Sequence, residues 1–461
     1  MNLSIHIRLY AVLAYTLILF VNTYFLQAQG ELTFTKNAIS GATTGTWGMD
    51  VADFTGDGYA DIITSHTFQN KVYLYTSNSA SSFSNTTIST AQKYPYEVHA
   101  ADVDKDGDMD LVISYEGNDT IRWLKNNGSG GFTAVTVGNT ADGPENVATG
   151  DIDGDGNIDV VATSADDGGK VQWFKNNGDD TFATAANIGT GIDGASEVIV
   201  KDMNNDNRLD IVVALFNGNK VYWYENGENE SFTRHNVGDS RLCDSIHVVD
   251  IDGDNDMDIF SGSSVDNNFY WFKNTGTASS PSFSKTTIDS SFDDPSSIVT
   301  ADLDEDNDLD IVVTSDGGKV FWFENDGSQN FTKKTIDGNL SSAEVVRVAD
   351  MDNDGDLDVI AAAINASTVW YESNASTLNV EVVYPQTAVL YPNPTARVLQ
   401  LDYVADTYTE YGLFDITGKR LTTFTKTGKH HTLDVSSLSK GTYLLKVTSG
   451  LQFAYYRFVK E

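Results

Sequence analysis

Cysteine is almost absent from this chain of 461 residues, in which Cys243 is the only one. A single thiol forms no intrachain disulfide, so a disulfide framework is excluded and another source must supply any cross-linking of the fold. A passive, half-buried thiol is favoured over a reactive one.

Positive charge is also scarce, with 29 Lys and Arg against 66 Asp and Glu and a formal net charge of −37. We therefore expect no binding to nucleic acid or to an anionic membrane surface.

Long apolar runs are also lacking, except at the N-terminus. The run Leu9–Val21 follows an arginine and is followed by a more polar segment. It is shorter than the roughly 20 apolar residues that a bilayer-spanning helix needs. The pattern predicts a signal peptide over residues 1–28, cleaved after Ala28, rather than an uncleaved anchor. We accordingly expect no membrane span in the mature chain.

What the chain has in abundance is an acidic segment of nine residues that occurs seven times. Each copy has oxygen-bearing side chains, nearly always Asp, at positions 1, 3, 5 and 9. The copies begin 49, 49, 51, 48, 52 and 48 residues apart, and they hold 30 Asp, whereas the whole chain has 66 acidic residues. Seven copies at this period predict a repeat architecture. We name them Asp loops one to seven: residues 53–61, 102–110, 151–159, 202–210, 250–258, 302–310 and 350–358.

The residue types in the Asp loops are typical of a site for a hard cation. Oxygen ligands suit Ca²⁺, and they suit neither zinc nor copper. Position 6 is always Gly or Asn, which tolerate the left-handed conformation that lets a loop curl round a centre. Position 8 is always apolar and is expected to anchor the loop to a core. The candidate ligands, loop by loop, are Asp53, Thr55, Asp57 and Asp61; Asp102, Asp104, Asp106 and Asp110; Asp151, Asp153, Asp155 and Asp159; Asp202, Asn204, Asp206 and Asp210; Asp250, Asp252, Asp254 and Asp258; Asp302, Asp304, Asp306 and Asp310; and Asp350, Asp352, Asp354 and Asp358.

Two other interpretations of these loops were weighed. An EF-hand requires a Glu at position 12 and flanking helices, whereas position 12 of Asp loop two is Ile113, inside a β-branched run. An acidic turn without an ion would leave up to five Asp of one loop repelling one another. The sequence therefore predicts up to seven structural Ca²⁺ ions.

The segments around each Asp loop read as short strands. A β-branched run follows the loop, as in Asp210–Ala214, and then comes a run with an aromatic core, such as Lys170–Phe174. Asn-Gly turns and a run that opens with Phe-Thr, such as Phe331–Ile336, complete the unit. Four antiparallel strands in each of seven units predict an all-β fold, a seven-bladed β-propeller. The tryptophan of the third run, replaced by Leu74 in the first unit, is expected to pack between blades rather than to bind ligands.

Ring closure can be predicted from the two ends of the repeat region. The seventh unit lacks its own Phe-Thr run, whereas Leu32–Ile39 at the mature N-terminus matches that pattern. This segment is expected to complete the seventh blade and so to remove two exposed sheet edges. The competing candidate is Leu378–Val383, which follows the seventh unit directly.

An Asp-x-Asp-x-Asp-Gly-x-x-Asp loop followed by a strand resembles the FG-GAP/VCBS repeats, the family that includes the propeller of the integrin α-subunit. The resemblance covers roughly residues 31–373. It implies side-chain ligands at positions 1, 3, 5 and 9 and a backbone oxygen at position 7. Thr55 and Asn204 at position 3 and Arg208 at position 7 depart from the family pattern, which puts Asp loops one and four in doubt as metal sites.

The repeat pattern stops near Tyr384 and gives way to about 75 residues of short strands and turns. They predict a small Ig-like β-sandwich. Tyr391–Thr395, Leu413–Lys419, Gly441–Val447 and the C-terminal Arg457–Lys460 resemble the type IX secretion sorting domain. The alternative, a generic adhesion module, does not explain these motifs. The predicted domains are a propeller over residues 29–378, a linker over 379–386 and a sorting domain over 387–461. The resemblance implies contact with the type IX machinery and a location outside a Gram-negative cell, secreted or on its surface.

In this strand order the Asp loops share one face of the propeller, so a ligand would use the opposite face. Exposed aromatics beside carboxylates suit sugar rings, and the leading hypothesis is a non-catalytic module that binds an extracellular glycan or protein. The alternative is a polysaccharide lyase, with His66, Lys93 and Arg241 available, and a third possibility is a structural spacer. His99, His247 and Arg347 occupy equivalent places in the innermost strands, where packing is favoured over a role in a channel. The candidate face comprises Trp47, His66, Phe68, Tyr94, Tyr96, Tyr115, Glu116, Arg241, Asp244, Asp293 and Asp294.

Overall fold

A computed structural model describes residues 32–39, 45–77, 82–89, 92–139, 143–165, 168–277, 279–375, 389–391, 394–402, 409–415, 419–426, 430–449 and 452–461. Two compact units divide the described chain: the repeat region within residues 30–376 and a C-terminal unit within residues 377–461. The predicted signal peptide and the competing segment Leu378–Val383 lie outside the described residues.

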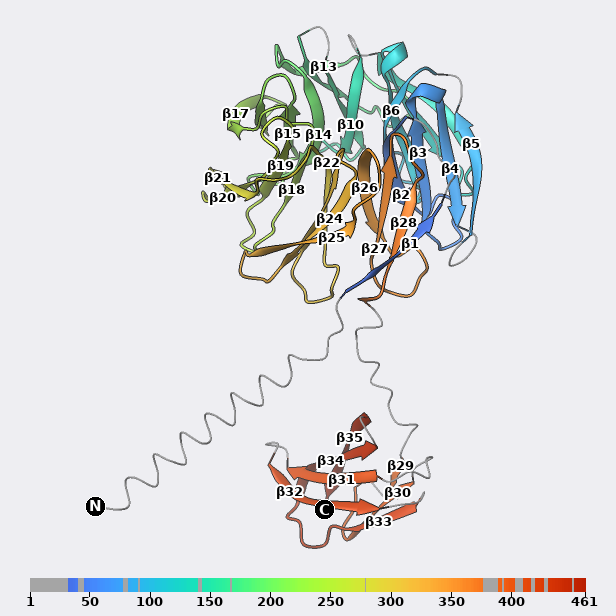
Figure 1. Ribbon diagram of the computed structural model, residues 1–461, viewed down its shortest axis with the longest axis vertical. Coiled ribbons are helices and arrows are strands. Elements are labelled where there is room, and N and C mark those ends of the chain that lie inside the picture. Colours follow the sequence, from blue (N-terminus) through green and yellow to red (C-terminus); the bar gives the residue numbers. More distant parts are fainter. Residues whose placement is uncertain are drawn as a thin grey trace, which may run out of the picture. The chain divides into compact units, whose positions relative to one another are not determined.

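The repeat region forms seven antiparallel sheets of four strands each, which confirms the seven-bladed β-propeller (Figure 1). Blade one contains β2 (Thr46–Ala52), β3 (Asp61–His66), β4 (Lys71–Ser77) and β5 (Phe83–Ser89). Blade two contains β6 (Pro95–Ala101), β7 (Asp110–Tyr115), β8 (Thr120–Asn126) and β9 (Phe132–Asn139). Blade three contains β10 (Pro144–Gly150), β11 (Asp159–Ser164), β12 (Lys170–Phe174) and β13 (Ala186–Thr190). Blade four contains β14 (Ala195–Lys201), β15 (Asp210–Leu215), β16 (Lys220–Asn226) and β17 (Phe232–Asp239).

The remaining three blades have the same strand order. Blade five contains β18 (Ile246–Val249), β19 (Asp258–Ser263), β20 (Asn268–Asn274) and β21 (Phe283–Asp289). Blade six contains β22 (Pro295–Ala301), β23 (Asp310–Ser315), β24 (Lys319–Asn325) and β25 (Phe331–Asp337). Blade seven contains β26 (Ala343–Ala349), β27 (Asp358–Ala363), β28 (Val369–Ser373) and, as its outermost strand, β1 (Phe34–Ala38). Each Asp loop joins the first strand of a blade to the second.

The second strand of every blade is buried along its whole length of six residues. Neighbouring blades cover both of its faces, which explains why these strands are continuous β-branched or small apolar runs rather than alternating ones. Each begins with the Asp at position 9 of its loop. The loops are therefore anchored directly to the most buried strands of the fold.

Tryptophans of the third strands pack against the next blade. The Trp123 ring meets Phe182 of blade three edge-on, with centroids 6.2 Å apart, and the Trp271 ring meets Phe331 of blade six at 5.9 Å. Such edge-to-face contacts add about 0.5–1.5 kcal/mol beyond burial. They explain why the fourth strand opens with Phe, and they confirm that these tryptophans serve blade packing.

The N-terminal strand closes the ring, as the Phe-Thr signature predicted. Strand β1 pairs with β28 in antiparallel register, from Phe34 opposite Ser373 to Ala38 opposite Val369. The Phe34 ring meets Trp322 of blade six edge-on at 6.3 Å, so β1 fills the place that a fourth strand takes in every other blade. A strand from the start of the repeat region thus completes the blade at its end.

The C-terminal unit is a small sandwich of two sheets. One sheet contains β29 (Val389–Tyr391), β30 (Val398–Asp402) and β33 (His430–Asp434). The other contains β32 (Arg420–Lys426), β31 (Thr409–Asp415), β34 (Gly441–Ser449) and β35 (Gln452–Lys460). Their shared core is built from Leu399, Leu413, Val435, Tyr443 and Phe458.

Helical structure is minor in the described residues. It consists of two 3₁₀ turns, η1 (Thr67–Gln69) and η2 (Glu116–Asn118), which follow the second strands of blades one and two. No helix in the described ranges has the length and apolarity to cross a membrane.

Cys243 is completely buried between blades four and five rather than half-buried. Burial raises the pKa of its thiol to about 12. The thiol is therefore protonated at neutral pH, and because the thiolate is the reactive form, Cys243 serves packing.

Candidate metal loops and axial cavity

The Asp at position 9 fastens each loop to its blade. In all seven blades its Oδ1 accepts a hydrogen bond over 2.6–3.0 Å from a backbone N–H at the end of the third strand, or just beyond it in blade three, where Asn176 is the donor. In Asp loop two, Oδ2 of Asp110 also accepts from the N–H of Val103 and from the indole of Trp123. Burial raises the pKa of Asp110 to about 6 and that of Asp310 to about 7. These carboxylates are therefore structural groups as well as candidate ligands.

The Asp side chains at positions 1 and 5 shape the loop from within. Asp102 accepts hydrogen bonds from the N–H groups of Asp106 and Gly107, both over 3.1 Å. Asp106 in turn accepts from the N–H of Asp108 over 3.0 Å. The left-handed backbone predicted at position 6 is present in every loop, with φ between 66° and 100°. Position 4 is left-handed as well, with φ of 60° at Lys105, which the sequence analysis did not anticipate.

The apolar residues at position 8 pack against the core in five loops, as predicted, but position 2 is the more deeply buried anchor. The residue at position 8 is only half-buried in every loop. The residue at position 2 is apolar and at most 5 % exposed in every loop. These anchors are Phe54, Val103, Ile152, Met203, Ile251, Leu303 and Met351.

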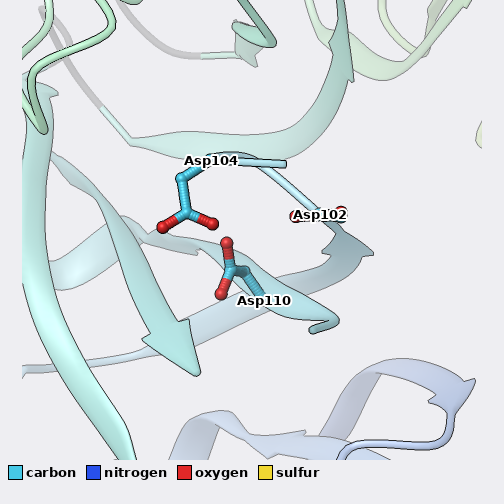
Figure 2. A group of neighbouring side chains, drawn as sticks. All are labelled: Asp102, Asp104 and Asp110. Carbon is cyan, nitrogen blue, oxygen red and sulfur yellow. The ribbon is translucent and has the colours of Figure 1, made fainter. Parts of the chain in front are cut away.

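In five loops the carboxylates converge as a metal site requires. Three carboxylates of each loop place oxygens within 4.8 Å of one another, and Figure 2 shows Asp104 and Asp110 of loop two facing each other near Asp102. Within the described chain, loops one and four form no such group; they are the two loops with Thr55 and Asn204 at position 3. The five groups are Asp102, Asp104 and Asp110; Asp151, Asp153 and Asp159; Asp250, Asp252 and Asp254; Asp302, Asp304 and Asp306; and Asp350, Asp352 and Asp358.

Each of these five loops also holds a buried carboxylate oxygen that has no hydrogen-bond partner in the described chain. It is the Oδ1 atom of Asp104, Asp151, Asp252, Asp304 or Asp350. A buried polar oxygen without a hydrogen-bond partner is costly, whereas oxygens of this kind are the ligands that Ca²⁺ takes. The residues present therefore fit a bound Ca²⁺.

Basic side chains divide the loops into two kinds. In loops two, three and five a lysine at or just after the end of the third strand contacts the position-3 Asp: Lys125 with Asp104, Lys175 with Asp153, and Lys273 with Asp252. In loop four, Arg208 pairs with Asp206.

Loops six and seven have an acid at the place where loops two, three and five have the lysine. Glu324 and Glu372 occupy that place, and they help to raise the pKa values of Asp304 and Asp352 to about 6, although burial is the larger cause. The position-3 Asp of loops six and seven thus has no lysine contact in the described chain, and in loop six Lys334 pairs with Glu324 instead, over 3.0 Å.

Side chains at position 4 link neighbouring loops around the face. The Asn353 amide donates to the carbonyl of Gly58 over 3.0 Å, which joins loop seven to loop one, and Asn205 donates to the carbonyl of Asn255 over 2.9 Å. Lys105 makes the same contact with Gly156. These bonds confirm that the loops lie side by side on one face.

A cavity lies along the axis of the ring, lined by the first strands. Its outer part has a volume of about 80 Å³ and is lined by the residue six places before each Asp loop, one from every blade. We call these residues the mouth ring: Trp47, Tyr96, Glu145, Ser196, Asp244, Ser296 and Glu344. Because the Asp loops follow the other ends of the same strands, the mouth opens on the opposite face.

A wider part of the cavity, of about 320 Å³, is lined by the residue three places before each Asp loop. We call these residues the inner ring: Asp50, His99, Ala148, Ile199, His247, Val299 and Arg347. Both parts share Glu97, Glu197 and Arg347. His99, His247 and Arg347 therefore line this cavity, and each also contacts another blade, in keeping with the packing role that was favoured.

Contacts between blades hold the charged groups of the inner ring. Arg347 donates from Nε to Asp50 over 3.3 Å and from Nη2 to Glu97 over 3.5 Å. His99 contacts the Thr149 hydroxyl over 3.1 Å. Burial raises the pKa of Glu97 to about 8, against the effect of Arg347, and lowers that of His99.

The structure brings together only some of the residues that the sequence analysis assigned to the face opposite the Asp loops. Trp47, Tyr96 and Asp244 line the mouth, and Phe68 and Tyr94 are 62 % and 45 % exposed on the same face. Glu116, Arg241 and Asp293 are exposed and Asp294 is half-buried, but none of these four lines the mouth.

The assignment of His66 and Tyr115 to this face was wrong. Both are strand ends rather than loop residues, and they are at most 1 % exposed. The sequence analysis also missed Glu145, Glu344, Glu97 and Glu197 in the cavity. Glu145 and Glu344 lie six places before an Asp loop, and Glu97 and Glu197 lie five places before one. A comparison of these two positions across the seven repeats would have found them.

Comparisons with known proteins agree with this architecture. The model for an FG-GAP-like repeat matches residues 19–64, 65–113, 102–162, 151–213, 202–261, 250–313 and 302–361. The model for a secretion system C-terminal sorting domain matches residues 389–461. No curated protein matches the chain. A solved structure described as a candidate gluconolactonase is 10% identical, with a TM-score of 0.42, and the match covers 76% of this chain and 95% of that chain. Such a score supports no transfer of activity.

The family matches follow the structural repeat. From the third match onward, each begins at the first Asp of a loop and ends in the second strand of the next blade. The sorting-domain match coincides with the C-terminal sandwich, which implies delivery by the type IX system to the outside of the cell or its surface. The chain therefore belongs to the FG-GAP-like repeat family, as a seven-bladed propeller with a C-terminal secretion sorting domain.

Proposed function

We propose that this secreted propeller is a calcium-stabilised binding module whose ligand, a glycan or a protein, is held at the mouth ring. The proposal rests on the different roles that the residues on the two faces of the propeller would have. Seven Asp loops occupy one face, and one equivalent residue from each blade lines a cavity that opens on the other. A cavity lined by aromatic and polar side chains at the end of a propeller is the kind of place where ligands bind.

Calcium in this proposal is structural. The convergent carboxylates and their unpartnered buried oxygens lie on the face away from the mouth. When bound, Ca²⁺ would neutralise charge that the chain cannot neutralise itself, since it has no disulfide and few basic residues. Counting one ion for each of the seven loops would reduce the formal charge from −37 to about −23.

The charge of the mouth weighs against the lyase alternative. A lyase acting on a polyuronate needs a positive group beside the substrate carboxylate. Here the mouth ring contributes Glu145, Asp244 and Glu344, and Arg347 is already held by Asp50 and Glu97. An anionic polysaccharide would be repelled.

A screen of the mature protein tests the proposal. The protein is applied to a glycan array and to a peptide array in Ca²⁺, and the same glycans are assayed for new unsaturated ends. Binding without new ends, reduced by substitutions in the mouth ring, supports a binding module. New unsaturated ends would indicate a lyase instead, and a protein that binds neither array would be a spacer.

A further inference from the structure

Asp loop four contains a positive side chain of its own. Arg208 occupies position 7, where loops two, five, six and seven have an Asp. Its Nη2 contacts Oδ2 of Asp206 inside the loop, and its Nε donates to the backbone carbonyl of Asn226 over 2.7 Å. Asn226 is the last residue of β16 and is only 1 % exposed. The planar guanidinium, with donors pointing in several directions, thus bridges the loop and the buried end of its own third strand.

The other hydrogen bonds of the Asp206 carboxylate are made within the loop. Oδ1 accepts from the backbone N–H of Arg208 over 2.9 Å, and Oδ2 accepts from the side-chain amide of Asn204 over 3.3 Å. The same amide donates to Glu225 over 3.4 Å. An Asp at position 3 would put a second carboxylate here, whereas Asn204 supplies donors. N–H groups therefore surround the position-5 carboxylate that the family pattern assigns to the cation.

The five loops that fit Ca²⁺ differ from loop four in two ways. Each gathers three carboxylates, and each has a buried carboxylate oxygen without a hydrogen-bond partner in the described chain. Loop four lies wholly within the described residues and has neither feature. A lysine contact alone does not remove the second feature, because loops two, three and five keep such an oxygen, on Asp104, Asp151 and Asp252. The residues of loop four therefore do not fit a bound Ca²⁺.

We propose that the guanidinium of Arg208 takes the place of the cation in Asp loop four, which is closed with or without Ca²⁺. The positive charge of Arg208 would also repel an incoming divalent ion. This inference rests on the calcium part of the proposed function, and it does not depend on what the mouth ring binds. Removal of Ca²⁺ would accordingly loosen the loops that fit the ion and leave loop four of the same ring in place.

Loop six provides a matched reference for loop four. Both have Asn at position 6 and a Glu before the Asn that ends the third strand. In both loops the backbone N–H groups of positions 5 and 6 donate to the Asp at position 1. The distances are 3.2 and 2.8 Å to Asp202 in loop four, and 3.0 Å for both bonds to Asp302 in loop six. Exchange of these equivalent amides with deuterium measures how readily each loop opens.

The first test measures hydrogen exchange by mass spectrometry on the mature protein, in Ca²⁺ and in EDTA, well below the melting temperature. We expect the loop-six amides to exchange about tenfold faster in EDTA and the loop-four amides to exchange at the same rate in both buffers. Arg208→Met should make the loop-four amides exchange about tenfold faster in EDTA, because Asp206 then loses its counter-ion. The inference is overturned if this variant exchanges like the wild type in EDTA.

Two further outcomes separate this inference from the calcium proposal. If wild-type loop four responds to EDTA as loop six does, loop four holds an ion, and the inference fails while the calcium proposal stands. If neither loop responds, there is no cation for Arg208 to replace, and both fail together.

The second test asks whether loop four can be given an ion. Asn204→Asp/Arg208→Asp gives it the same residues as loop six at positions 1, 3, 5, 6, 7 and 9. In equilibrium dialysis this variant should bind one more Ca²⁺ per chain than the wild type, and its loop-four amides should become sensitive to EDTA. The control is Arg241→Asp, which reverses the charge of an exposed arginine on the opposite face and should bind the wild-type number. An unchanged count in the double variant, or an equal gain in the control, would overturn the role of Arg208.

Discussion

Trp123 donates a hydrogen bond from its indole nitrogen to Oδ2 of Asp110 over 2.9 Å, which joins the third strand of blade two to Asp loop two. The same carboxylate accepts backbone hydrogen bonds from Val103 and Asn126. The last Asp of the loop thus has a structural role whether or not a cation is bound. Asp104 of the same loop instead has a buried oxygen without a hydrogen-bond partner.

These two roles can be separated by substitution. Asp110→Ala leaves three buried donors unsatisfied, and we expect it to lower the free energy of unfolding by roughly 3–5 kcal/mol with or without Ca²⁺. Asp104→Asn keeps the side-chain volume, so it should matter chiefly in Ca²⁺. Urea unfolding in Ca²⁺ and in EDTA measures both. Equal losses for Asp104→Asn in the two buffers would show that it is not a metal ligand.

Removal of Ca²⁺ should destabilise the whole propeller. A ligand that binds only the folded state stabilises it by about 2.7 kcal/mol per site at a hundredfold excess over Kd. With several loops acting together, EDTA should lower the melting temperature by on the order of ten degrees. Ca²⁺ should restore it better than Mg²⁺, which requires stricter octahedral geometry. A melting curve that does not respond to EDTA would mean that the loops are acidic turns only.

The seven loops should differ in affinity. Loops six and seven combine convergent carboxylates with Glu324 and Glu372, whereas a lysine contacts the position-3 Asp in loops two, three and five. An ammonium this close repels an incoming divalent ion. Calorimetric titration of the EDTA-treated protein should therefore resolve two sites about tenfold tighter than the others.

A lysine substitution tests the cause of this difference. Lys273→Met, which frees Asp252 in loop five, should raise the number of tight sites from two to three. The control is Lys333→Met, because Lys333 pairs with Asp289 away from the loops, 2.7 Å from its carboxylate. The explanation fails if both variants titrate like the wild type.

Closure by β1 makes the N-terminal strand essential to the ring. Deleting residues 32–39 exposes the edge of β28 and removes the contact between Phe34 and Trp322. We expect aggregation and a lower melting temperature, measured by light scattering and calorimetry, because an unpaired edge recruits other chains. Phe34→Ala should show a milder loss of about 1 kcal/mol or more. A deletion variant that stays monomeric with unchanged melting would show that another segment fills the edge.

The repeat pattern was sufficient to predict the blade count, the strand order and the closure by β1. Each depends on a short signal that recurs through the repeats, such as Trp in the third strand of six blades and Phe-Thr at the start of the fourth strand in four. His66 and Tyr115 were assigned wrongly because a strand end and a loop start cannot be told apart by composition. Both side chains lie one residue inside the boundary, where the neighbouring blade covers them.

The contacts between blades were harder to predict. That Lys273 reaches Asp252 depends on the register between the third strand and the loop, and that Asn353 reaches Gly58 depends on closure of the ring. Neither distance is fixed by local sequence. The mouth ring could have been predicted in part, because its seven members all lie six places before an Asp loop. The sequence does not show, however, which face of the first strand points to the axis, because the packing of the blades sets that orientation.

The axial cavity should also make stability depend on pH. Burial raises the pKa values of Glu97 and Glu197 from 4.5 to about 8. Glu97 faces Arg347 and Asp50, and Glu197 faces Arg347, Asp244 and the N–H of Ile246. The folded protein therefore holds protons that the unfolded chain releases above pH 4.5. Their stabilising contribution is complete below that pH and is lost as the pH rises through about 8.

We therefore expect the free energy of unfolding, measured with urea in saturating Ca²⁺, to fall between pH 5 and pH 8.5. Each carboxyl contributes a slope of up to about 1.4 kcal/mol per pH unit. The variant Glu97→Gln/Glu197→Gln has neutral side chains of the same shape at both positions. Its free energy of unfolding should therefore equal that of the wild type near pH 5 and exceed it near pH 8.5. Asp293→Asn, at an exposed position outside the cavity, is the control and should follow the wild-type curve. Parallel curves for the double variant and the wild type would show that both glutamates are already ionised in the folded protein, with Arg347 as the counter-ion that keeps them so.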